Sequence, residues 1–323
     1  MGMGQVSVLL GECSVFRMER FITSLTVSSG HYTTVETRLF SGLMKVFFRT
    51  CSCYVALYAC YLLEYCFRKG GNAAIFLNFL MYCFAEQRGE TSHRFATRHG
   101  LPGAVGIIDG TPINFAQRPH IDGEVWFSRK QRYSMNLQLV CDDRGKILYY
   151  IAGWPGSVYD NTVLNQSPLA LQHQDFFLPG QFLLADAGYA STSWCVTPYR
   201  NPAAQLPINQ VFNELFSSAR CRIEHVNGVL KNRFGSLRGL RLAIRTHADF
   251  QRVNLWIVVC LLLHNLLTEY EDPWEEEDEM DDEEDDDILP QPVGANLAAA
   301  NNFRTQVQVG LLTWFNERQG VLA

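Results

Sequence analysis

The order of strand and helix patterns between Leu101 and about Thr268 is the feature that most restricts the fold of this chain. Residues 104–115 form a β-branched run with an Asp-Gly pair inside it, which predicts a strand. Residues 133–157 contain two apolar or alternating runs around Asp142–Gly145, a turn signature that predicts a hairpin. This region therefore begins with three strands.

The second half of the region predicts a helix, a strand and two long helices. A helix should start near Asp160, because Asp160-Asn161-Thr162 is typical N-cap chemistry and apolar residues follow it. Residues 181–190 indicate a buried strand that ends at Asp186, and helical patterns cover about 209–234 and 246–270. This order predicts an α/β fold with an RNase H-like catalytic core, in which helices flank a mixed sheet.

The flanking regions have a different character. Residues 1–85 are rich in cysteine and aromatic residues and predict a helical N-terminal region. Its uncharged stretches, 50–63 and 71–85, are shorter than the ~20 residues that span a bilayer, which favours two buried helices over a membrane hairpin. From Glu269 we expect a largely disordered tail, with an amphipathic helix at 303–315. The predicted domains are 1–85, 86–268 and 269–323.

The net charge of −6 averages two opposite regions. Residues 269–287 hold 15 acidic and no basic side chains, so the remainder carries a net charge of +9. A basic body is expected of a protein that meets polyanions, and an acidic enzyme for cationic substrates is disfavoured.

Cysteine use and the N-terminus indicate an intracellular protein. None of the ten cysteines forms a CxxC pair, which favours reduced thiols. The first 20 residues lack a basic leader, so we expect no secretory signal.

Three carboxylates occupy positions where carboxylates are costly. Asp109 and Asp186 each follow an apolar run, and Glu224 lies in a predicted helix. A carboxylate at the end of a buried strand must be paired, hydrogen-bonded or bound to a cation. Three that converge can hold two Mg²⁺ or Mn²⁺ ions, and two such ions about 3.5–4 Å apart promote in-line attack at a phosphodiester. Asp109, Asp186 and Glu224 are therefore the predicted catalytic, metal-binding residues.

Each of these residues also has a structural interpretation. Asp109-Gly110 and the Asp-Ala-Gly sequence at Asp186 are common turns, and a helical Glu beside Arg is usually a surface pair. Asp160 follows the turn Gly153-Trp154-Pro155-Gly156-Ser157. Two roles could explain Asp160. It could be the N-cap of the following helix, or it could lie at the metal site as a ligand or a support.

The helix around Glu224 carries two cations on the same face. Arg220 is four residues before Glu224 and Lys231 is seven residues after it, so the three side chains share one stripe. The arrangement suits a metal-binding carboxylate between phosphate-binding cations, and the alternative is an ordinary salt-bridged stripe.

Four segments, in order, resemble the DDE-type transposases, specifically the PIF/Harbinger group with its domesticated nuclease relatives. The first segment, GIIDGTPI (106–113), is similar to the strand with the family's first catalytic Asp. The second, SMNLQLVCDDRGKILYYIAGWPGSVYDNTVL (134–164), is similar to the next two strands with the PGS-x-x-D turn. LLADAGYA (183–190) is similar to the segment with the second Asp. ARCRIEHVNGVLKNRFGSL (219–237) is similar to the R-x-x-x-E helix.

The resemblance covers about residues 86–268 and implies a DDE endonuclease domain. It implies that Asp109, Asp186 and Glu224 are metal ligands and that Asp160 is a fourth acidic position of the metal site. Arg220, Glu224 and Lys231 also reproduce the R-(3)-E-(6)-K spacing of related insertion-sequence transposases. The chain departs from the family at Phe216-Ser217 and at Tyr159, where relatives usually carry histidine.

The implied partner is DNA. Arg129 and Lys130 stand among basic and aromatic residues, a composition typical of a groove that follows a nucleic-acid backbone, although scattered surface cations give the same pattern. Residues 1–85 show no convincing recognition helix. Either the segment is degenerate, or DNA binding is delegated, as the resemblance to family members that work with a Myb/SANT-like partner implies. We expect a nuclear protein, with the cytoplasm as a second location.

The leading interpretation is thus a Mg²⁺- or Mn²⁺-dependent endonuclease or transposase. A catalytically silent, domesticated adaptor that binds DNA or protein is the alternative, and a small-substrate phosphoesterase is disfavoured by the basic body. The acidic run 269–287 is either a solvated tail or an intramolecular DNA mimic that competes for the basic groove.

Overall fold

The computed structural model describes residues 88–269 and 297–320. Predictions for residues 1–85, with their two apolar stretches, lie outside these ranges. So do predictions for the acidic run beyond Glu269.

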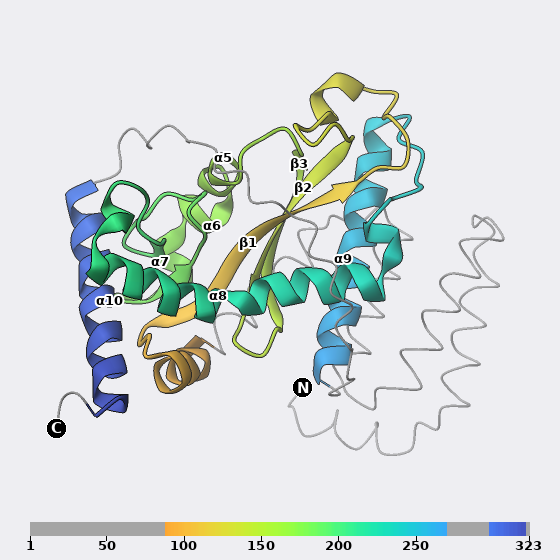
Figure 1. Ribbon diagram of the computed structural model, residues 1–323. Helices are drawn as coiled ribbons and strands as arrows, with labels where there is room; N and C mark the ends of the chain where they lie inside the picture. The colour runs from red at the N-terminus through yellow and green to blue at the C-terminus, as the bar shows by residue number, and fades with distance from the viewer. Residues whose placement is uncertain (1–87, 270–296, 321–323) are drawn as a thin grey trace, which may run out of the picture. The chain divides into compact units, whose positions relative to one another are not determined.

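The centre of the described region is a five-stranded mixed sheet (Figure 1). The strand order is β3-β2-β1-β4-β5; β2 is antiparallel to β1 and β3, whereas β4 is parallel to β1 and β5. The strands are β1 (Ala104–Asn114), β2 (Ser134–Cys141), β3 (Ile147–Pro155), β4 (Phe182–Leu184) and β5 (Cys195–Val196). The predicted mixed sheet flanked by helices is confirmed.

The β2–β3 hairpin follows from its turn chemistry. The Asp142 carboxylate accepts hydrogen bonds from the backbone N–H groups of Arg144 and Lys146, and Gly145 takes the left-handed conformation, with φ of 87°. Asp and Gly are the residue types that such a turn favours.

β5 was not predicted, because two residues are too few to show a periodic pattern.

The helices are the segment 88–99, three short helices after β3 and three long helices. The short ones are α5 (Asp160–Asn165), α6 (Pro168–Leu171) and α7 (His173–Phe176), and the long ones are α8 (Pro207–Arg233), α9 (His247–Glu269) and α10 (Leu297–Arg318). Three 3-10 turns, η1 (Gly123–Trp126), η2 (Ala203–Gln205) and η3 (Gly235–Leu237), complete the described elements.

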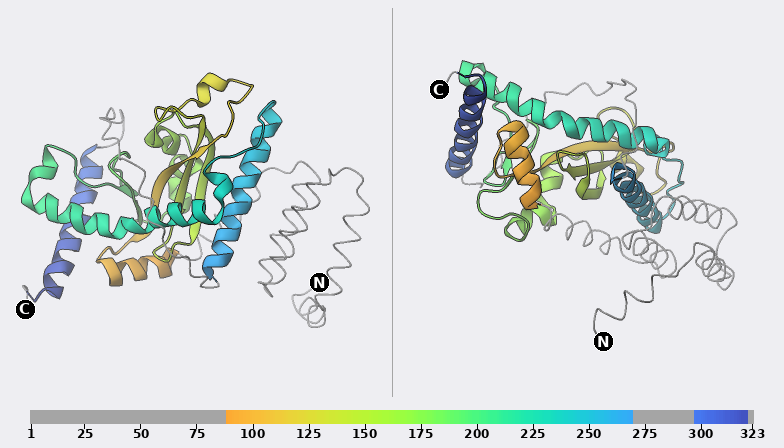
Figure 2. Two further views of the ribbon diagram at one scale, coloured as in Figure 1. Left: turned by 45° about the vertical axis from the view of Figure 1, so that its right-hand side comes forward. Right: turned by 90° about the horizontal axis from the view of Figure 1, so that it is seen from below.

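The helices form layers on the sheet (Figure 2). α8 contacts β1 and β2, α9 contacts β3 and α8, and α5–α7 bury apolar side chains against the opposite face from α8. The core on that face joins the sheet to the short helices; its members include Ile108, Val140, Tyr149, Val163, Leu169, Phe176 and Tyr189.

α9 is long and apolar enough to cross a membrane by length and composition alone. A buried core helix passes the same test, and the contacts of α9 favour that explanation. The Asn265 side chain accepts a hydrogen bond from the Ile147 N–H and donates one to the Ile147 carbonyl, at 2.7 Å each. These bonds fix α9 to the edge strand β3.

α10 corrects the prediction of a disordered tail from Glu269 onward. Its residues form a helix that contacts α8, and Ala300, Gln308 and Leu311 are buried. Gln308 donates to Asn209 of α8 at 2.7 Å. The predicted helix at 303–315 thus lies within α10, and the residues between Glu269 and α10 connect two folded helices.

Candidate metal and nucleic-acid site

Asp109 and Asp186 lie side by side where β1 and β4 run parallel. Ile107 and Leu184 are register partners, and each aspartate follows its partner residue by two positions. β1 continues through this point, since Asp109 pairs with Leu139 and Gly110 pairs with Gln138 of β2. The turn interpretation of Asp109-Gly110 is therefore excluded, and the carboxylate projects from the middle of a central strand.

Burial and neighbouring charges perturb both carboxylates. Burial raises the pKa of Asp109 well above its usual value, and the Asp186 carboxylate raises it further, while the Arg220 guanidinium opposes the rise. Burial also raises the pKa of Asp186, again against Arg220. Two desolvated carboxylates at neighbouring register positions favour a bound cation, because a cation relieves both their desolvation and their repulsion.

α8 reaches this pair through two side chains that are seven residues apart. Asn227 donates a hydrogen bond from Nδ2 to Oδ2 of Asp109 at 2.9 Å. Arg220 is 6% exposed, so it serves as a buried countercharge for the aspartates. Its predicted role as a surface phosphate contact remains a prediction.

Glu224 lies between Arg220 and Asn227 on the same stripe of α8, and its side chain is exposed. Lys231 continues that stripe one turn beyond Asn227. The structure thus places the predicted Glu224 at an exposed position of α8, three residues before Asn227, which contacts Asp109.

Asp160 lies on the face of the sheet opposite to the one from which Asp109 projects. Tyr159 occupies the N-cap position of α5, so the Asp160 carboxylate is not the cap that the sequence suggested. The carboxylate lies over Gly110, where any Cβ would overlap it. Gly110 and Asp109 are consecutive in β1 and project to opposite faces, so Asp160 lies across the strand from Asp109.

Two amides of β2 hold the Asp160 carboxylate. Asn136 donates to Oδ1 at 2.5 Å and Gln138 donates to the same oxygen at 3.3 Å and to the Asp160 carbonyl at 2.8 Å. Burial raises the pKa of Asp160, and these two amides oppose the rise. Of the two roles weighed for Asp160, this geometry favours a support over a direct ligand.

In the described part of the chain, no three His, Cys, Asp or Glu side chains already form a metal-holding group. The aspartate pair and its surroundings still fit a divalent cation. The pair supplies carboxylate oxygens, and the buried Oδ1 of Asn227, whose Nδ2 contacts Asp109, has no hydrogen-bond partner. Oxygen donors are the ligands that Mg²⁺ and Mn²⁺ prefer. The predicted role of Glu224 as a further ligand remains a prediction.

Sequence reasoning missed the three amides around the carboxylates. Asn136 and Gln138 alternate on one face of β2, a strand buried at every position, and this pattern was a signal that they had a specific role. Asn227 is three residues after Glu224, on the stripe that the sequence had singled out.

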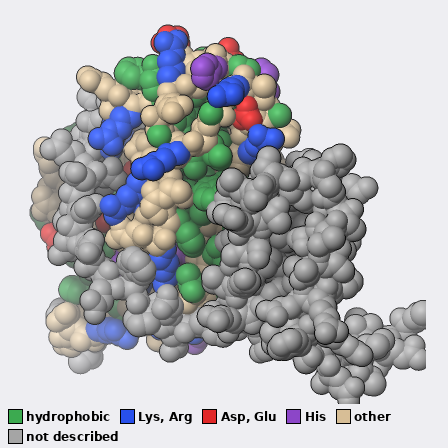
Figure 3. Space-filling model, turned by 90° about the vertical axis from the view of Figure 1, so that its right-hand side faces the viewer, with side chains coloured by type: hydrophobic (Ala, Val, Ile, Leu, Met, Phe, Trp, Pro, Cys, Tyr) green, Lys and Arg blue, Asp and Glu red, His purple; other side chains and the backbone are tan. Residues whose placement is uncertain are grey.

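Basic and aromatic groups border the Asp160 side of the site. The predicted nucleic-acid contacts Arg129 and Lys130 lie in the connection between β1 and β2. The Arg129 guanidinium lies 3.8 Å from the centre of the Tyr159 ring, and Tyr159 is exposed beside Asp160. Lys and Arg also predominate over Asp and Glu on the one face that Figure 3 shows. This surface suits a polyanion.

The sequence of residues 108–265 matches the model of a known family, described as DDE superfamily endonuclease. The bovine protein "Putative nuclease HARBI1" is 30% identical over 176 residues, which are 54% of this chain and 49% of that protein. The human protein of the same name gives the same figures. "Protein ALP1-like" of Arabidopsis thaliana is 31% identical over 198 residues, 57% of this chain and 47% of that protein.

The chain therefore spans about half the length of the curated relatives that it matches. No solved structure gave a significant match.

Proposed function

Since residues 108–265 place this chain in the DDE superfamily endonuclease family, we propose that it cleaves phosphodiester bonds of DNA with a divalent metal by the two-metal DDE mechanism. The observation that carries the proposal is the Asp109–Asp186 pair, set side by side by the parallel register of β1 and β4. The strand order and directions support an RNase H-like core for the domain. Relatives named nuclease support the reaction class.

The proposed roles follow from the positions of the residues. Asp109, Asp186 and Glu224 would hold Mg²⁺ or Mn²⁺, which, when bound, lowers the pKa of an attacking water and neutralises charge on the scissile phosphate. Asn227 orients Asp109, and Asn136 and Gln138 orient Asp160. Arg220 balances the aspartates, and Arg129, Lys130 and Lys231 bind backbone phosphates.

The cellular setting is part of the proposal. A protein that cleaves DNA acts in the nucleus, and a Myb/SANT-like partner would supply sequence recognition. A catalytically silent adaptor is the second candidate, and the exposure of the Glu224 side chain is the observation that favours it.

Nicking of supercoiled plasmid in Mg²⁺ or Mn²⁺ tests the proposal. We expect the wild type to nick DNA and Asp109→Asn, Asp186→Asn and Glu224→Gln each to reduce nicking to background. Asp175→Asn is the matched control, because Asp175 is exposed on α7 and its change removes the same charge. Nicking that survives all three site variants would refute the DDE mechanism, and a wild type without nicking would favour the adaptor.

A further inference from the structure

A cavity lies between α8, α9 and the turn that joins β2 to β3. Its volume is about 140 Å³, well above the ~10–15 Å³ that holds one water molecule. The charged or titratable side chains that line it are Arg144, Arg222, His225, Arg233 and His264. Among the described residues, no Asp or Glu lines the cavity, and the predicted metal ligands lie outside it. A cavity with this lining attracts an anion.

α8 lines the cavity with a different stripe from the one that carries the predicted metal ligand. Arg222, Val226 and Arg233 are four and then seven residues apart, so their side chains share one side of the helix. A Cβ on Gly145 would lie 3.1 Å from Cγ2 of Val226 and 3.7 Å from Cδ of Arg222. The absence of a side chain at Gly145 therefore lets the turn approach α8 closely. This approach brings Arg222 beside the turn that carries Arg144.

His264 is the buried polar residue of the cavity, with 2% of its surface exposed. Its Nε2 contacts the Gly145 carbonyl at 3.1 Å, and since a carbonyl only accepts, Nε2 carries the proton. Nδ1 is then an acceptor, and it is buried without a hydrogen-bond partner in the described part of the chain. A buried polar atom without a partner is costly, so Nδ1 indicates a group held in the cavity. The O–H of a hydrogen phosphate, or a water bound to an anion, would satisfy it.

The arginines of the cavity suit a phosphate group in particular. Arg144 and Arg222 are exposed and Arg233 is half-buried. A guanidinium group donates from a planar fork that matches the oxygens of a phosphate. The pair of Arg144 with Glu90 spans 3.8 Å between side chains that are 59% and 65% exposed, so it contributes little and leaves Arg144 able to bind an anion. Several guanidinium groups together repel a metal cation, which disfavours a second metal site here.

We propose that this cavity is a phosphate-binding site. Arg144, Arg222 and Arg233 bind the phosphate oxygens, and Nδ1 of His264 accepts from the phosphate or from its water. A phosphate of the DNA backbone and free phosphate share this chemistry, and the net charge of +9 outside the acidic run favours the DNA backbone. The assignment to DNA rests on the proposed function, whereas the phosphate site itself does not.

The first test follows thermal melting of the full chain in inorganic phosphate and in chloride at equal ionic strength. The wild type should melt about 2–4 °C higher in phosphate, because a ligand of the folded state stabilises that state. Arg222→Ala should lose most of this shift, since it removes an exposed donor without changing the core. Arg252→Ala is the matched control on α9, because Arg252 is exposed and paired with Asp249, and it should keep the shift.

The second test measures the affinity for a duplex oligonucleotide in EDTA over a series of salt concentrations. If the cavity holds a backbone phosphate, the plot of log affinity against log salt should be less steep for Arg222→Ala than for the wild type, by about 0.9 for one lost phosphate contact. Arg252→Ala should keep the slope of the wild type. A change in melting without a change in slope would assign the cavity to free phosphate.

The proposal is overturned if neither the melting shift nor the salt slope depends on Arg222. It is also overturned if Arg252→Ala changes both as much as Arg222→Ala does, because the effect would then be one of net charge. Neither test needs metal or cleavage, so they separate this site from the proposed function. A wild type that binds phosphate through Arg222 and does not nick DNA would refute the proposed function and leave the phosphate site in place.

Discussion

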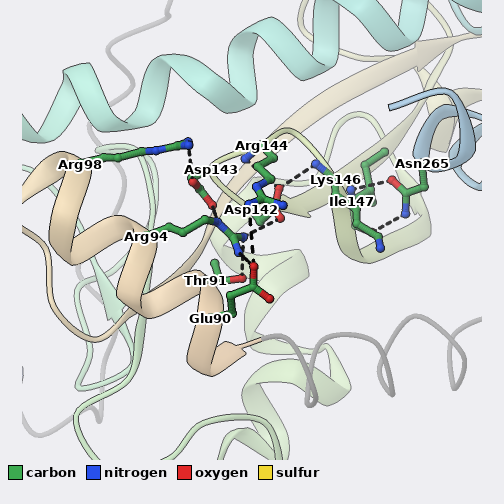
Figure 4. A network of polar contacts seen from close by, with 10 residues as sticks. All are labelled: Glu90, Thr91, Arg94, Arg98, Asp142, Asp143, Arg144, Lys146, Ile147 and Asn265. Atoms are coloured by element: carbon green, nitrogen blue, oxygen red, sulfur yellow. Dashed lines mark hydrogen bonds and ion pairs between the residues drawn. The ribbon is translucent and has the colours of Figure 1, made fainter. Parts of the chain in front are cut away.

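Two pairs of aspartates in this domain, the buried Asp142 and Asp143 and the partly buried Asp109 and Asp186, have opposite surroundings. Arg94 contacts Asp143 at 2.7 Å and Asp142 at 3.0 Å, and Arg98 contacts Asp143 at 2.9 Å (Figure 4). These ion pairs fix the helix at 88–99 to the β2–β3 turn. Asn227 and the Gly188 N–H, which donate hydrogen bonds to Asp109 and Asp186, are instead uncharged.

The difference separates a structural role from a functional one. Burial raises the pKa of Asp142, but the N–H groups of Lys146 and Arg144 and the guanidinium of Arg94 oppose the rise. The negative charge of Asp142 is thus balanced by groups of the protein itself. Arg220 and, for Asp186, also Arg200 oppose the raised pKa values of Asp109 and Asp186, but burial dominates, which leaves the pair suited to an external cation.

The largest expected effect is at Asp109, where a substitution should abolish nicking without lowering the stability of the protein. Asp109→Asn should reduce nicking to background, while the free energy of unfolding of the metal-free protein stays equal or rises, because a repelled and desolvated charge is removed. Urea unfolding followed by circular dichroism measures the stability. A large loss of stability in this variant would mean that Asp109 is a structural residue like Asp143.

The converse change is Arg94→Ala. It leaves Asp142 and Asp143 buried without their shared guanidinium, so we expect the free energy of unfolding to fall by about 3–5 kcal/mol. At temperatures where the variant is still folded, its nicking activity per folded molecule should equal that of the wild type. Arg252→Ala is a suitable control, since Arg252 makes an exposed pair with Asp249 that should contribute little. Equal stability of the two variants would contradict the structural role of the Asp142–Asp143 group.

His264 makes the same turn sensitive to pH. Its Nε2 contacts the Gly145 carbonyl at 3.1 Å, and burial, aided by Arg233 and His225, lowers its pKa from 6.5 to about 4. The unfolded chain takes up a proton near pH 6.5 and the folded one only near pH 4, so stability is complete above pH 6.5 and is lost as the pH falls to about 4.

The loss from His264 is about 3 kcal/mol at most. His264→Gln keeps a side-chain donor near Gly145 and removes the titration, so unfolding measured between pH 7 and pH 4 should show a shallower slope than in the wild type. Parallel slopes in the two proteins would show that His264 is not held neutral by the fold.

The smallest expected effect is at Asn227. Asn227→Leu removes the hydrogen bond to Asp109 and should weaken Mn²⁺ affinity or nicking roughly 10–100-fold. Asn232→Leu on the same helix is the control, because Asn232 lies away from the aspartates and contacts Arg238. If Asn227→Leu bound Mn²⁺ and nicked DNA as well as Asn232→Leu does, Asn227 of α8 would have no role in the metal site.

The sequence predicted the elements that carry strong periodic signals and the carboxylates that interrupt them. β1, the hairpin, α8 and α9 were predicted close to their observed bounds, since alternation, turn residues and helical spacing are local properties. β5 and the packing of α10 were not predictable, because a two-residue strand has no pattern and α10 is held by distant partners such as Asn209.

The site shows the same limit. Asp109 and Asp186 stood out as carboxylates after apolar runs, and their proximity follows from the β1–β4 register. The face on which Asp160 lies could not be read from the sequence, because it depends on how α5 returns to the sheet over Gly110. The amides that hold the carboxylates were missed, because hydrogen-bond partners between β2, α5 and α8 are tertiary contacts.

The most direct test of the central claim is a calorimetric titration of Mn²⁺ into the wild type, Asp109→Asn and Asp143→Asn. The two variants remove the same charge from the two aspartate pairs. If the Asp109–Asp186 pair is the cation site, the wild type and folded Asp143→Asn will bind Mn²⁺ alike and Asp109→Asn will not bind it. Equal binding by Asp109→Asn and the wild type would contradict the account.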